Sequence, residues 1–330
     1  MLRGCVRPGL SYQYGEPDKA LVSARAGRTL REIASLRVLS YPHSMAAAKK
    51  ALITEGPART AEGVAAVREP DDGLSLRQRY DLVRQRIADA AARTGRTTKE
   101  IILVAVTKTA SVDQIRHLIE LGHEDFGENR VQNLEKRMAV IDEFLRRHRE
   151  LGSTKDGVKV PERVRWHMIG HLQRNKVRRI AGRVRLIQSV DSLRLVEELH
   201  AIAVRLDEPI ELLVQVNVSG EGQKYGLAPA AAKHLVDQVD TMIGLRARGL
   251  MCMAPLSPDP EDSRPVFERC REIYDDIRRS GAGGPSFDIL SMGMSSDFEV
   301  GIDCGSNLVR IGTAIFGPQL HESPDEEPED

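Results

Sequence analysis

Aromatic residues are scarce in this chain: they make up 4% of its 330 residues and include a single tryptophan. Proteins that stack nucleotide bases on an open surface use such rings, so the composition argues against a base-stacking platform. An excess of one charge is missing as well, because 48 Lys and Arg residues face 48 Asp and Glu residues. A chain without net charge has no general attraction to nucleic acid or to an anionic membrane, and we expect neither partner.

Cysteine is equally sparse, and the four residues Cys5, Cys252, Cys270 and Cys304 form no CxxC or CxxH pair. This spacing predicts neither a disulfide framework nor a zinc site, and it favours a reducing compartment. No apolar run approaches the length of roughly 20 residues that crosses a bilayer. We therefore expect a cytoplasmic protein without a membrane span.

Both ends of the chain differ from its middle. Residues 1–45 carry seven Arg and Lys residues against three Asp and Glu residues. This bias is typical of a transit peptide and would target an organelle, but we favour a disordered or wrongly assigned upstream extension with Met45 as the true start. Within the tail 319–330, the stretch His321–Asp330 is acidic and lacks apolar anchors, which predicts that it is solvated. The expected parts are an N-terminal extension over 1–75, disordered or partly helical, a folded domain over 76–318, and this tail.

Between the two ends, short β-branched runs alternate with helical stretches. The expected strands are Ile101–Thr107, Asp125–Asn129, Arg165–Gly170, Leu186–Asp191, Glu211–Val218, Leu245–Met253, Phe287–Gly293 and Leu308–Ile311. The expected helices are Leu76–Arg93, Ser111–Gly122, 130–147, 174–181, Leu193–Arg205, Pro229–Asp240, Ser263–Arg279 and 297–302. This alternation predicts a parallel sheet with helical crossovers.

Eight strand–helix units match the repeat number of a closed (β/α)8 barrel, which is our predicted fold class. An open, doubly wound sheet is the alternative, but no GxGxxG motif follows the first strand, as a dinucleotide fold would require. Residues 148–163 are polar and are expected to form a loop at the end of the barrel away from the carboxyl ends of the strands.

Lys108 directly follows the almost wholly apolar first strand, in the segment AVTKT. The active face of such a barrel lies at the carboxyl ends of its strands, so we expect Lys108 there. Burial at this position would lower the pKa of its amine and make it nucleophilic, as Schiff-base formation with an aldehyde requires. A rim lysine that reaches into water is the other interpretation.

The turns after the last two strands are rich in glycine and hydroxyl residues. Ser291–Ser296 reads SMGMSS, and Gly312–Thr313 follow the eighth strand. Both are candidates for a phosphate site, although ordinary βα turns share this composition, and Asp297 is expected to cap the helix that follows the first turn. Arg310 lies among apolar neighbours and needs a partner or a ligand. Together with Lys108, these features indicate a phosphorylated aldehyde.

Seven motifs, AVTKT, FGENRVQN, WHMIGHLQRNKV, VNVSGEGQKYG, GLMCMAP, SMGMSSDFEVGI and VRIGTAIFG, occur in this order over about residues 76–318. In sequence and order they resemble those of the pyridoxal phosphate homeostasis protein family, also called the YggS/PROSC-like proteins. The resemblance implies a (β/α)8 TIM barrel similar to the barrel domain of alanine racemase. It also implies that pyridoxal 5'-phosphate is bound without an established catalytic activity.

The resemblance further implies six cofactor-binding residues: Lys108 as the Schiff-base lysine, Asn129 beside the ring, Arg310 at the pyridine nitrogen, and Ser295, Gly312 and Thr313 at the phosphate. A permanent cation at the ring nitrogen keeps that nitrogen unprotonated and weakens the cofactor as an electron sink. Ala110 departs from the family, which often has a lysine or a proline at this position.

From this resemblance we expect a non-catalytic carrier in intracellular cofactor homeostasis, a monomer or weak dimer with apo pyridoxal phosphate enzymes as candidate recipients. Alanine racemase uses a tyrosine from a second domain, whereas only an acidic tail follows Gly317 here. One alternative is a small pyridoxal phosphate-dependent racemase or lyase, for which Tyr225 is the first candidate for a second base. The other is a Schiff-base aldolase that uses Lys108 on a phosphorylated sugar.

Some other polar residues suggest ligands less strongly. His167 and His171 are four residues apart, but the strand runs into Gly170, so no helix would place both on one face and no metal is expected. The basic run Arg174–Arg179 is interpreted as a solvated helix face rather than a nucleic-acid surface. Lys224 follows the fifth strand, at the active face, either as a ligand contact or in a plain loop.

Overall fold

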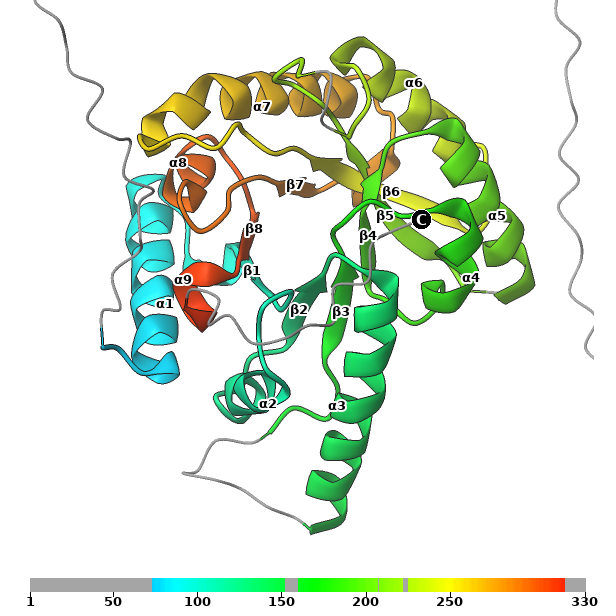
Figure 1. Ribbon diagram of the computed structural model, residues 1–330. Helices are drawn as coiled ribbons and strands as arrows, with labels where there is room; N and C mark the ends of the chain where they lie inside the picture. The colour runs from blue at the N-terminus through cyan, green and yellow to red at the C-terminus, as the bar shows by residue number, and fades with distance from the viewer. Residues whose placement is uncertain (1–72, 152–159, 207, 222–224, 318–330) are drawn as a thin grey trace, which may run out of the picture. The chain divides into compact units, whose positions relative to one another are not determined.

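Eight parallel strands close into a barrel in the computed structural model, which describes residues 73–151, 160–206, 208–221 and 225–317 (Figure 1). The strands are β1 (Ile102–Val106), β2 (Asp125–Glu128), β3 (Arg165–Met168), β4 (Leu186–Val190), β5 (Ile210–Gln215), β6 (Leu245–Met251), β7 (Ile289–Ser291) and β8 (Leu308–Ile311). They pair in sequence order, and β8 pairs with β1. The predicted (β/α)8 barrel is therefore confirmed, and the open-sheet alternative is wrong.

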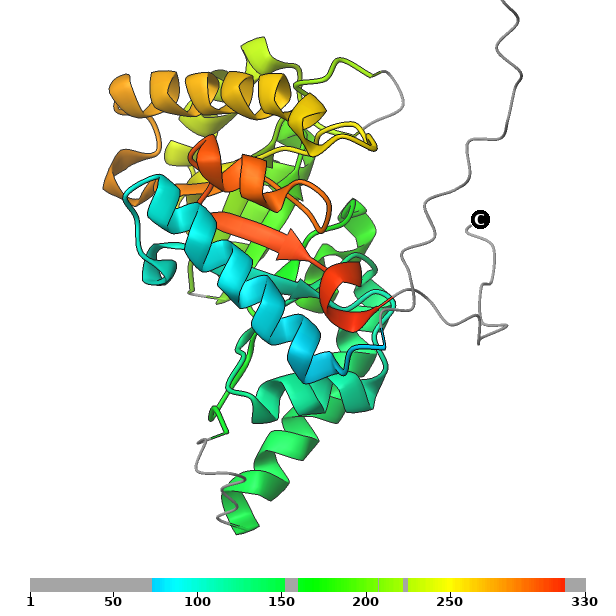
Figure 2. The same ribbon diagram turned by 90° about the vertical axis from the view of Figure 1, so that its left-hand side faces the viewer.

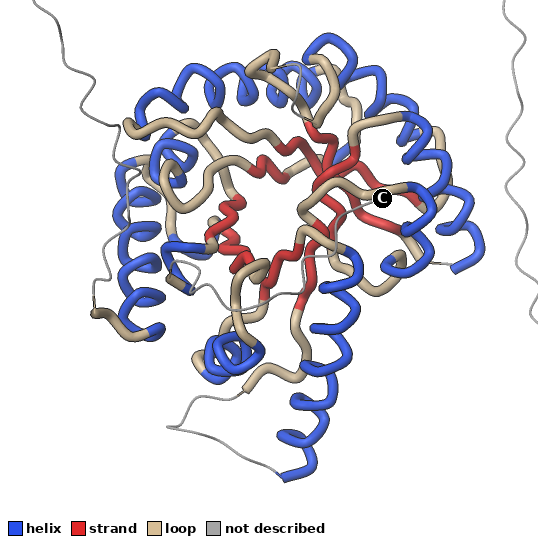
Figure 3. Tube along the Cα trace, in the orientation of Figure 1, coloured by secondary structure: helices blue, strands red, loops and turns tan. Residues whose placement is uncertain are grey.

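Helices form an outer layer around the ring of strands, as Figure 3 shows. They are α1 (Leu76–Arg93), α2 (Val112–Glu120), α3 (Val131–Leu151), α4 (Val177–Ile180), α5 (Leu193–Leu206), α6 (Pro229–Asp240), α7 (Arg264–Arg279), α8 (Phe298–Asp303) and α9 (Thr313–Phe316). Four 3-10 turns lie between them, at Thr98–Glu100, Arg174–Lys176, Pro260–Ser263 and Gly284–Ser286. The helix predicted over 174–181 is thus a 3-10 turn followed by one α-helical turn.

Local sequence explains where the first two helices begin and end. Ser75 and Ser111 each accept a hydrogen bond from the backbone N–H of the glutamine three residues later. The backbone N–H of each serine in turn donates to the side-chain oxygen of that glutamine. These reciprocal capping boxes satisfy N–H groups that a helix leaves unpaired at its start. Gly122 has a φ of 87°, which places it in the left-handed conformation that commonly ends a helix.

Closure of the barrel joins segments from the two ends of the described chain. Ile102 on β1 is in register with Leu308 on β8. Helix α1 lies beside β8 and α8, as Figure 2 shows, and Arg86 on α1 forms an ion pair with Glu299 on α8 at 2.7 Å. The buried apolar residues of α1 belong to the same core cluster as Ala105 on β1 and Val309 on β8, so this helix covers the seam where the barrel closes.

The barrel interior contains an apolar layer with polar residues beyond it. The apolar layer comprises Val104, Leu186, Leu213, Met251, Ile289 and Leu308. Successive side chains along a strand point to opposite faces, so residues two positions further along also point inward. Ser291 on β7 and Arg310 on β8 hold such positions, closer to the carboxyl ends of the strands. The interior is therefore apolar in its middle and polar toward the mouth.

Three sequence predictions concern the margins of this barrel. The loop predicted over 148–163 begins later, because α3 continues to Leu151; residues 152–159 lie outside the described ranges. The predicted N-terminal extension, apart from residues 73–75, and the predicted acidic tail also lie outside them. Within these ranges no helix has both the length and the apolar character needed to cross a membrane.

Candidate functional site

The six predicted cofactor residues lie on one sector of the carboxyl-end mouth. They are Lys108 after β1, Asn129 after β2, Ser295 in the turn between β7 and α8, Arg310 on β8, and Gly312 and Thr313 after β8. The four strands concerned are consecutive neighbours in the closed sheet, in the order β7, β8, β1 and β2. The fold therefore gathers the six positions without any contribution from the opposite side of the mouth.

Lys108 lies two residues beyond the end of β1, and its side chain is exposed. It forms no hydrogen bond or ion pair with any part of the chain that the structure describes. The prediction that Lys108 is buried at the end of its strand is therefore wrong, because Lys108 lies beyond the strand in a turn that the hydrogen bond from the Ala110 backbone N–H to the Thr107 carbonyl closes at 2.9 Å. An exposed amine at the mouth is instead directly accessible to an aldehyde arriving from solvent.

A buried glutamate, Glu128, supports the backbone just after β1 and just after β2, next to Lys108. It is fully buried at the end of β2, and it accepts hydrogen bonds from the Thr107 hydroxyl at 3.0 Å and the Asn129 backbone N–H at 2.8 Å. The guanidinium of Arg137 on α3 also donates to it. A buried carboxylate is costly unless it is paired in this way, and removal of one partner would leave it unsatisfied.

Arg137 extends the same support to the turn that carries Lys108. Its Nη2 donates to the backbone carbonyl of Ala110 at 3.0 Å. Thr107 and Ala110 lie on either side of the lysine, so the Glu128–Arg137 pair fixes both ends of its turn. Sequence reasoning missed this pair. The available signal was an acidic residue at the end of an apolar strand in FGE, which required a cationic partner.

The two turns predicted to bind phosphate, Ser291–Ser296 and Gly312–Thr313, meet at Ser295. Its Oγ accepts hydrogen bonds from the backbone N–H groups of Gly312 at 3.2 Å and Ala314 at 3.3 Å. A Cβ at Gly312 would lie 3.3 Å from the Val106 carbonyl oxygen, so glycine lets β8 and β1 approach closely here. The structure thus brings together a hydroxyl group and a cluster of backbone donors, which are the groups that bind phosphate oxygens in proteins.

Asp297 stabilises the SMGMSS turn from within. It occupies the N-cap position of α8, but its carboxylate accepts no hydrogen bond from the N–H groups of that helix, so the predicted cap is wrong in its detail. The carboxylate instead accepts from the Met294 backbone N–H at 2.6 Å and from the Ser263 hydroxyl at 3.1 Å. The turn that presents Ser295 is therefore tied to the start of α7.

Arg310 is a buried cation, with 4% of its surface exposed. Its Nη1 donates to Ser291 Oγ at 2.5 Å and its Nη2 to the Cys252 carbonyl at 2.9 Å. No carboxylate forms an ion pair with it in the described ranges. Burial lowers the pKa of Arg310, but a guanidinium stays charged even when it is buried in a protein. Two of its five N–H donors bond to protein, so the others remain for a ligand.

The two histidines of WHMIGH have separate partners. His167 is buried in the barrel, between Asp125 and Gln188. His171 lies at the mouth, with its Nδ1 3.5 Å from Asp191 and its ring stacked on Tyr225 at 4.1 Å between centroids. The described residues contain no group of three or more His, Cys, Asp or Glu side chains placed to hold a metal ion. Lys224 lies outside the described ranges.

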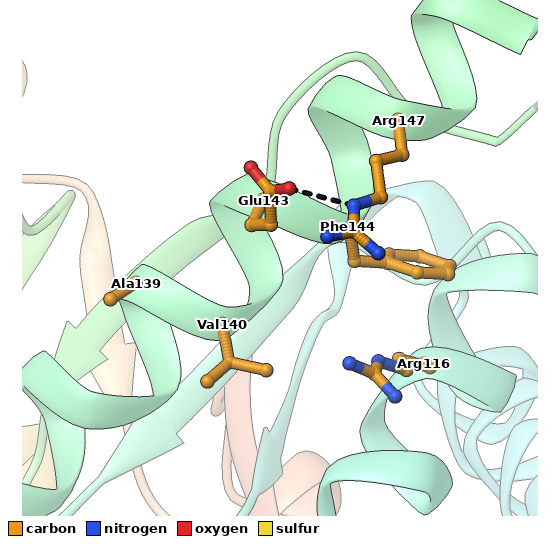
Figure 4. A pocket seen from close by; sticks show the side chains of 6 residues that line it. All are labelled: Arg116, Ala139, Val140, Glu143, Phe144 and Arg147. Atoms are coloured by element: carbon orange, nitrogen blue, oxygen red, sulfur yellow. Dashed lines mark hydrogen bonds and ion pairs between the residues drawn. The ribbon is translucent and has the colours of Figure 1, made fainter.

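A hollow of about 490 Å³ lies on the helix layer, between α2 and α3 (Figure 4). Its floor includes Phe144, over which the Arg116 guanidinium lies 5.7 Å from the ring centroid. Glu143 and Arg147 form an ion pair along its edge at 2.7 Å. The first α3 residue that lines the hollow, Ala139, comes eight residues after the helix begins at Val131, so the hollow is separate from the carboxyl-end site.

The alanine racemase N-terminal domain family matches residues 78–319, so the chain belongs to this class of (β/α)8 barrels. The pyridoxal phosphate homeostasis protein of Aquifex aeolicus (strain VF5) is 36% identical over 244 residues, which cover 74% of this chain and 98% of that protein. Its counterpart in Escherichia coli (strain K12) is 37% identical over 235 residues, which cover 71% of this chain and 93% of that protein. Within the class, this chain is a member of the pyridoxal phosphate homeostasis protein family.

Solved structures extend these similarities. An unknown protein from Bifidobacterium adolescentis is 36% identical, with a TM-score of 0.65 over 73% of this chain and 94% of that one. PipY of Synechococcus elongatus PCC7942, solved with pyridoxal phosphate bound, is 28% identical. The match has a TM-score of 0.57 and covers 74% of this chain and 100% of PipY. An alanine racemase of Clostridium difficile 630, at 14% identity and a TM-score of 0.52 over 76% and 57%, shares the fold.

Proposed function

We propose that this protein binds pyridoxal 5'-phosphate at the carboxyl-end mouth and acts in intracellular cofactor homeostasis, holding the cofactor as a Schiff base on Lys108. The observation that carries the proposal is Arg310, a buried cation with unused donors at the same mouth as Lys108, which has no partner among the described residues. The names of the homologues from A. aeolicus and E. coli, and the structure of PipY with pyridoxal phosphate, support it.

The residues at the mouth fit the polar parts of this cofactor. Lys108 offers an accessible amine for the aldehyde, and Arg310 offers only donors, as an unprotonated pyridine nitrogen requires. The hydroxyl hydrogens of Ser295 and Thr313 offer donors for the phosphate, beside the backbone N–H groups of Gly312 and Ala314 that donate to Ser295 Oγ. Asn129 follows β2 next to the lysine turn. The bound cofactor supplies an aldehyde carbon that condenses reversibly with a primary amine.

The same residues favour storage over turnover. Arg310 keeps its proton, so it holds the ring nitrogen unprotonated and limits the electron-withdrawing power that amino-acid chemistry draws on. The Glu128–Arg137 pair fixes the turn of Lys108, while the exposure of the lysine lets other amines reach the same carbon. A carrier that releases its cofactor to apo-enzymes needs such access.

The test compares two exposed lysines. Wild-type protein mixed with pyridoxal phosphate should develop the visible absorbance of a Schiff base, and borohydride should abolish this absorbance and fix the cofactor to the peptide that contains Lys108. Lys108→Ala should lose both signals while remaining folded. Lys99→Ala, at an equally exposed lysine before β1, should retain both. A wild type that shows no absorbance with excess cofactor, or an adduct on another lysine, contradicts the proposal.

A second measurement separates a carrier from a racemase or lyase. A racemase needs a base on each face of the substrate. Tyr225 is the first candidate for the second base, although the residue is 57% exposed and its ring is stacked on His171. We expect no exchange of α-hydrogen when loaded protein meets alanine or serine in deuterated water, and transfer of cofactor to an apo-enzyme on mixing. Turnover of about 1 per second or more would overturn the carrier role.

The aldolase alternative has its own signature. It predicts that borohydride traps a phosphorylated sugar on Lys108 in the absence of pyridoxal phosphate, and that the trapped protein is colourless. We expect no such trapping.

A further inference from the structure

Three polar side chains link Arg310 to Asp125 in one hydrogen-bonded line across the barrel interior. Arg310 donates to the Ser291 hydroxyl, and this hydroxyl donates to Gln188 Oε1 at 2.8 Å. Gln188 Nε2 lies 3.1 Å from His167 Nδ1. His167 Nε2 lies 3.1 Å from Asp125 Oδ1. The line therefore runs from the carboxyl-end mouth on β8 through β7, β4 and β3 to the amino end of β2.

The line is shielded from water over most of its length. Gln188 and Ser291 are fully buried, and His167 is 2% exposed. All three side chains point into the barrel. Gln188 and Ser291 each lie two residues beyond an inward-facing residue of the same strand, and His167 is in register with the inward-facing Leu186. At such positions an unsatisfied polar group destabilises the fold, so each member depends on its neighbours in the line.

The two ends of the line determine the direction of every bond in it. A guanidinium only donates and a carboxylate only accepts. Ser291 must therefore accept from Arg310 and donate to Gln188, whose amide then donates to His167 Nδ1. His167 is left with its hydrogen on Nε2, which donates to Asp125. One tautomer of a neutral imidazole satisfies the whole line.

The carboxylate end is held in its charged form. Arg165 donates to Asp125 through Nε at 2.8 Å and through Nη2 at 2.7 Å. Burial alone would raise the pKa of Asp125, but the hydrogen bonds from Arg165 and His167 outweigh this effect and keep the pKa below its ordinary value. Asp125 therefore stays a charged acceptor at neutral and mildly acidic pH.

We propose that Ser291, Gln188, His167 and Asp125 act as a positioning relay that orients Arg310 and stabilises its charge opposite the pyridine ring of the bound cofactor; the inference rests on the proposed function. The relay occupies one Nη1 donor of Arg310 and aligns its bond dipoles with their negative ends toward the guanidinium. The remaining donors of Arg310 are then directed to the ligand. The four residues act through Arg310 and do not touch the cofactor.

Two buried serines make a matched test. Ser291 belongs to the relay, whereas Ser189 is also fully buried on a barrel strand, β4, but its Oγ has no hydrogen-bond partner among the described residues. Ser291→Ala should weaken pyridoxal phosphate binding by about tenfold and shift the absorbance maximum of the bound cofactor. Ser189→Ala should leave the maximum unchanged and the affinity within about twofold of the wild type. Equal behaviour of the two variants contradicts the relay.

Asp125→Asn tests whether the effect reaches the mouth from the opposite end of the barrel. The variant keeps the size of the side chain and removes the charge, so we expect a smaller loss of affinity and a shift of the absorbance maximum in the same direction as for Ser291→Ala. Gln188→Met, of similar length and without hydrogen bonds, should reproduce the Ser291→Ala effect and serves if the aspartate variant fails to fold. Variants that fold and match the wild-type spectrum overturn the inference.

A measurement without cofactor separates this inference from the proposed function. Nitrogen-15 NMR of the protein alone should show the ring hydrogen of His167 on Nε2 and none on Nδ1, and Ser189→Ala should leave that signal unchanged. A hydrogen on Nδ1 breaks the line and overturns the relay. If the tautomer is as expected but Lys108 takes no cofactor, the proposed function fails and the relay alone stands.

Discussion

The amino-end mouth of the barrel is lined by paired charges, whereas the carboxyl-end mouth holds cations without ion-pair partners in the described ranges. At the amino end, Arg165 pairs with Asp125 at 2.7 Å, and Arg248 pairs with Glu211 at 2.7 Å. Glu211 also accepts from Arg185, so a single carboxylate joins the amino ends of β4 and β5 to Arg248 in the middle of β6. These charges compensate one another and leave nothing for a ligand.

At the carboxyl end, neither Lys108 nor Arg310 has a carboxylate partner in the part of the chain that the structure describes. The paired charges that do occur there, Glu128 and Arg137, lie behind the lysine turn and fix its backbone. In barrels of this class the amino end contributes stability and the carboxyl end binds ligands. The contrast shows this division at the level of single charges, and each prediction below tests one side of it.

Removal of Glu211 should have the largest effect on the amino end. Glu211→Ala leaves Arg185 and Arg248 without their shared partner, and we expect the free energy of unfolding to fall by about 4 kcal/mol. Urea unfolding of the variant measures it. Glu208→Ala, an exposed carboxylate just before β5, is the control and should change little. Cofactor affinity should stay near that of the wild type, and a large loss would mean that the two ends are not separate.

Acid should weaken the amino end through His123, which packs between α1 and β2. Burial lowers the pKa of His123 to about 4, and its ring bonds to Tyr80 and to the Asp125 carbonyl. As the pH falls, the unfolded chain takes up a proton on His123 before the folded protein does. The contribution of His123 to the free energy of unfolding is therefore complete above about pH 6.5 and falls by up to about 3 kcal/mol toward pH 4. Below pH 4 this group causes no further loss.

Urea midpoints measured from pH 7 to pH 4 check this slope. His123→Gln retains a donor for the Asp125 carbonyl but does not titrate, so it should be less stable at pH 7 and should lose the His123 part of the slope. His234→Gln, at an exposed histidine, should retain it. An unchanged slope in His123→Gln would assign the acid sensitivity to another group.

Substitutions in the phosphate turns should affect the carboxyl end alone. Ser295→Ala and Thr313→Val each remove a hydrogen bond to a charged group, worth about 1.5–3 kcal/mol, or about 10–150-fold in cofactor affinity. Equilibrium dialysis measures the affinity, and Ser296→Ala, at the exposed neighbouring hydroxyl, is the control. Pyridoxal without its phosphate should bind all of these proteins weakly. Wild-type affinity in both variants would place the phosphate elsewhere.

The smallest effect should come from the start of the domain. We propose that residues 76–318 contain all that the site needs, yet the structure adds Ser75, whose capping box begins α1. A fragment that starts at Leu76 should be less stable by about 1 kcal/mol than one that starts at Leu74, with equal cofactor occupancy. Thermal unfolding and absorbance measure the two properties. Failure of both fragments to fold would show that residues before 74 support the barrel.

Local pattern was enough to predict the strands and to single out Lys108, Arg310 and the two turns at the mouth, whereas Asn129 was named only through the family resemblance. The β-branched run at Ile101–Thr107 predicted β1 to within a residue at each end, and the eight-fold alternation predicted the closed sheet. Arg310 was predicted to need a partner or a ligand, because a guanidinium between apolar neighbours is costly to bury without one, and the structure confirms its burial. Helix ends were less accurate, since α3 continues four residues past its predicted end at 147.

What sequence reasoning missed depends on contacts between distant strands. Gln188 and Ser291 are 103 residues apart and meet only because β4 and β7 face each other across the interior. The exposure of Lys108 comes with the turn between Thr107 and Ala110, which the apolar strand before it does not reveal. Periodicity identifies which face of a strand is buried, but the partner of each buried polar group follows from closure of the barrel.

The seam between β1 and β8 has a consequence for how the protein is made. Strand β1 has no second neighbour until Leu308–Ile311 arrives, near the end of the described chain. A nascent chain therefore exposes the unpaired edge of β1 throughout synthesis of the other seven units, and such edges invite aggregation. Contacts between residues so far apart form slowly. Helix α1 is synthesised before β1 and covers the same seam, so it is positioned to shield the first strand while the last one is awaited.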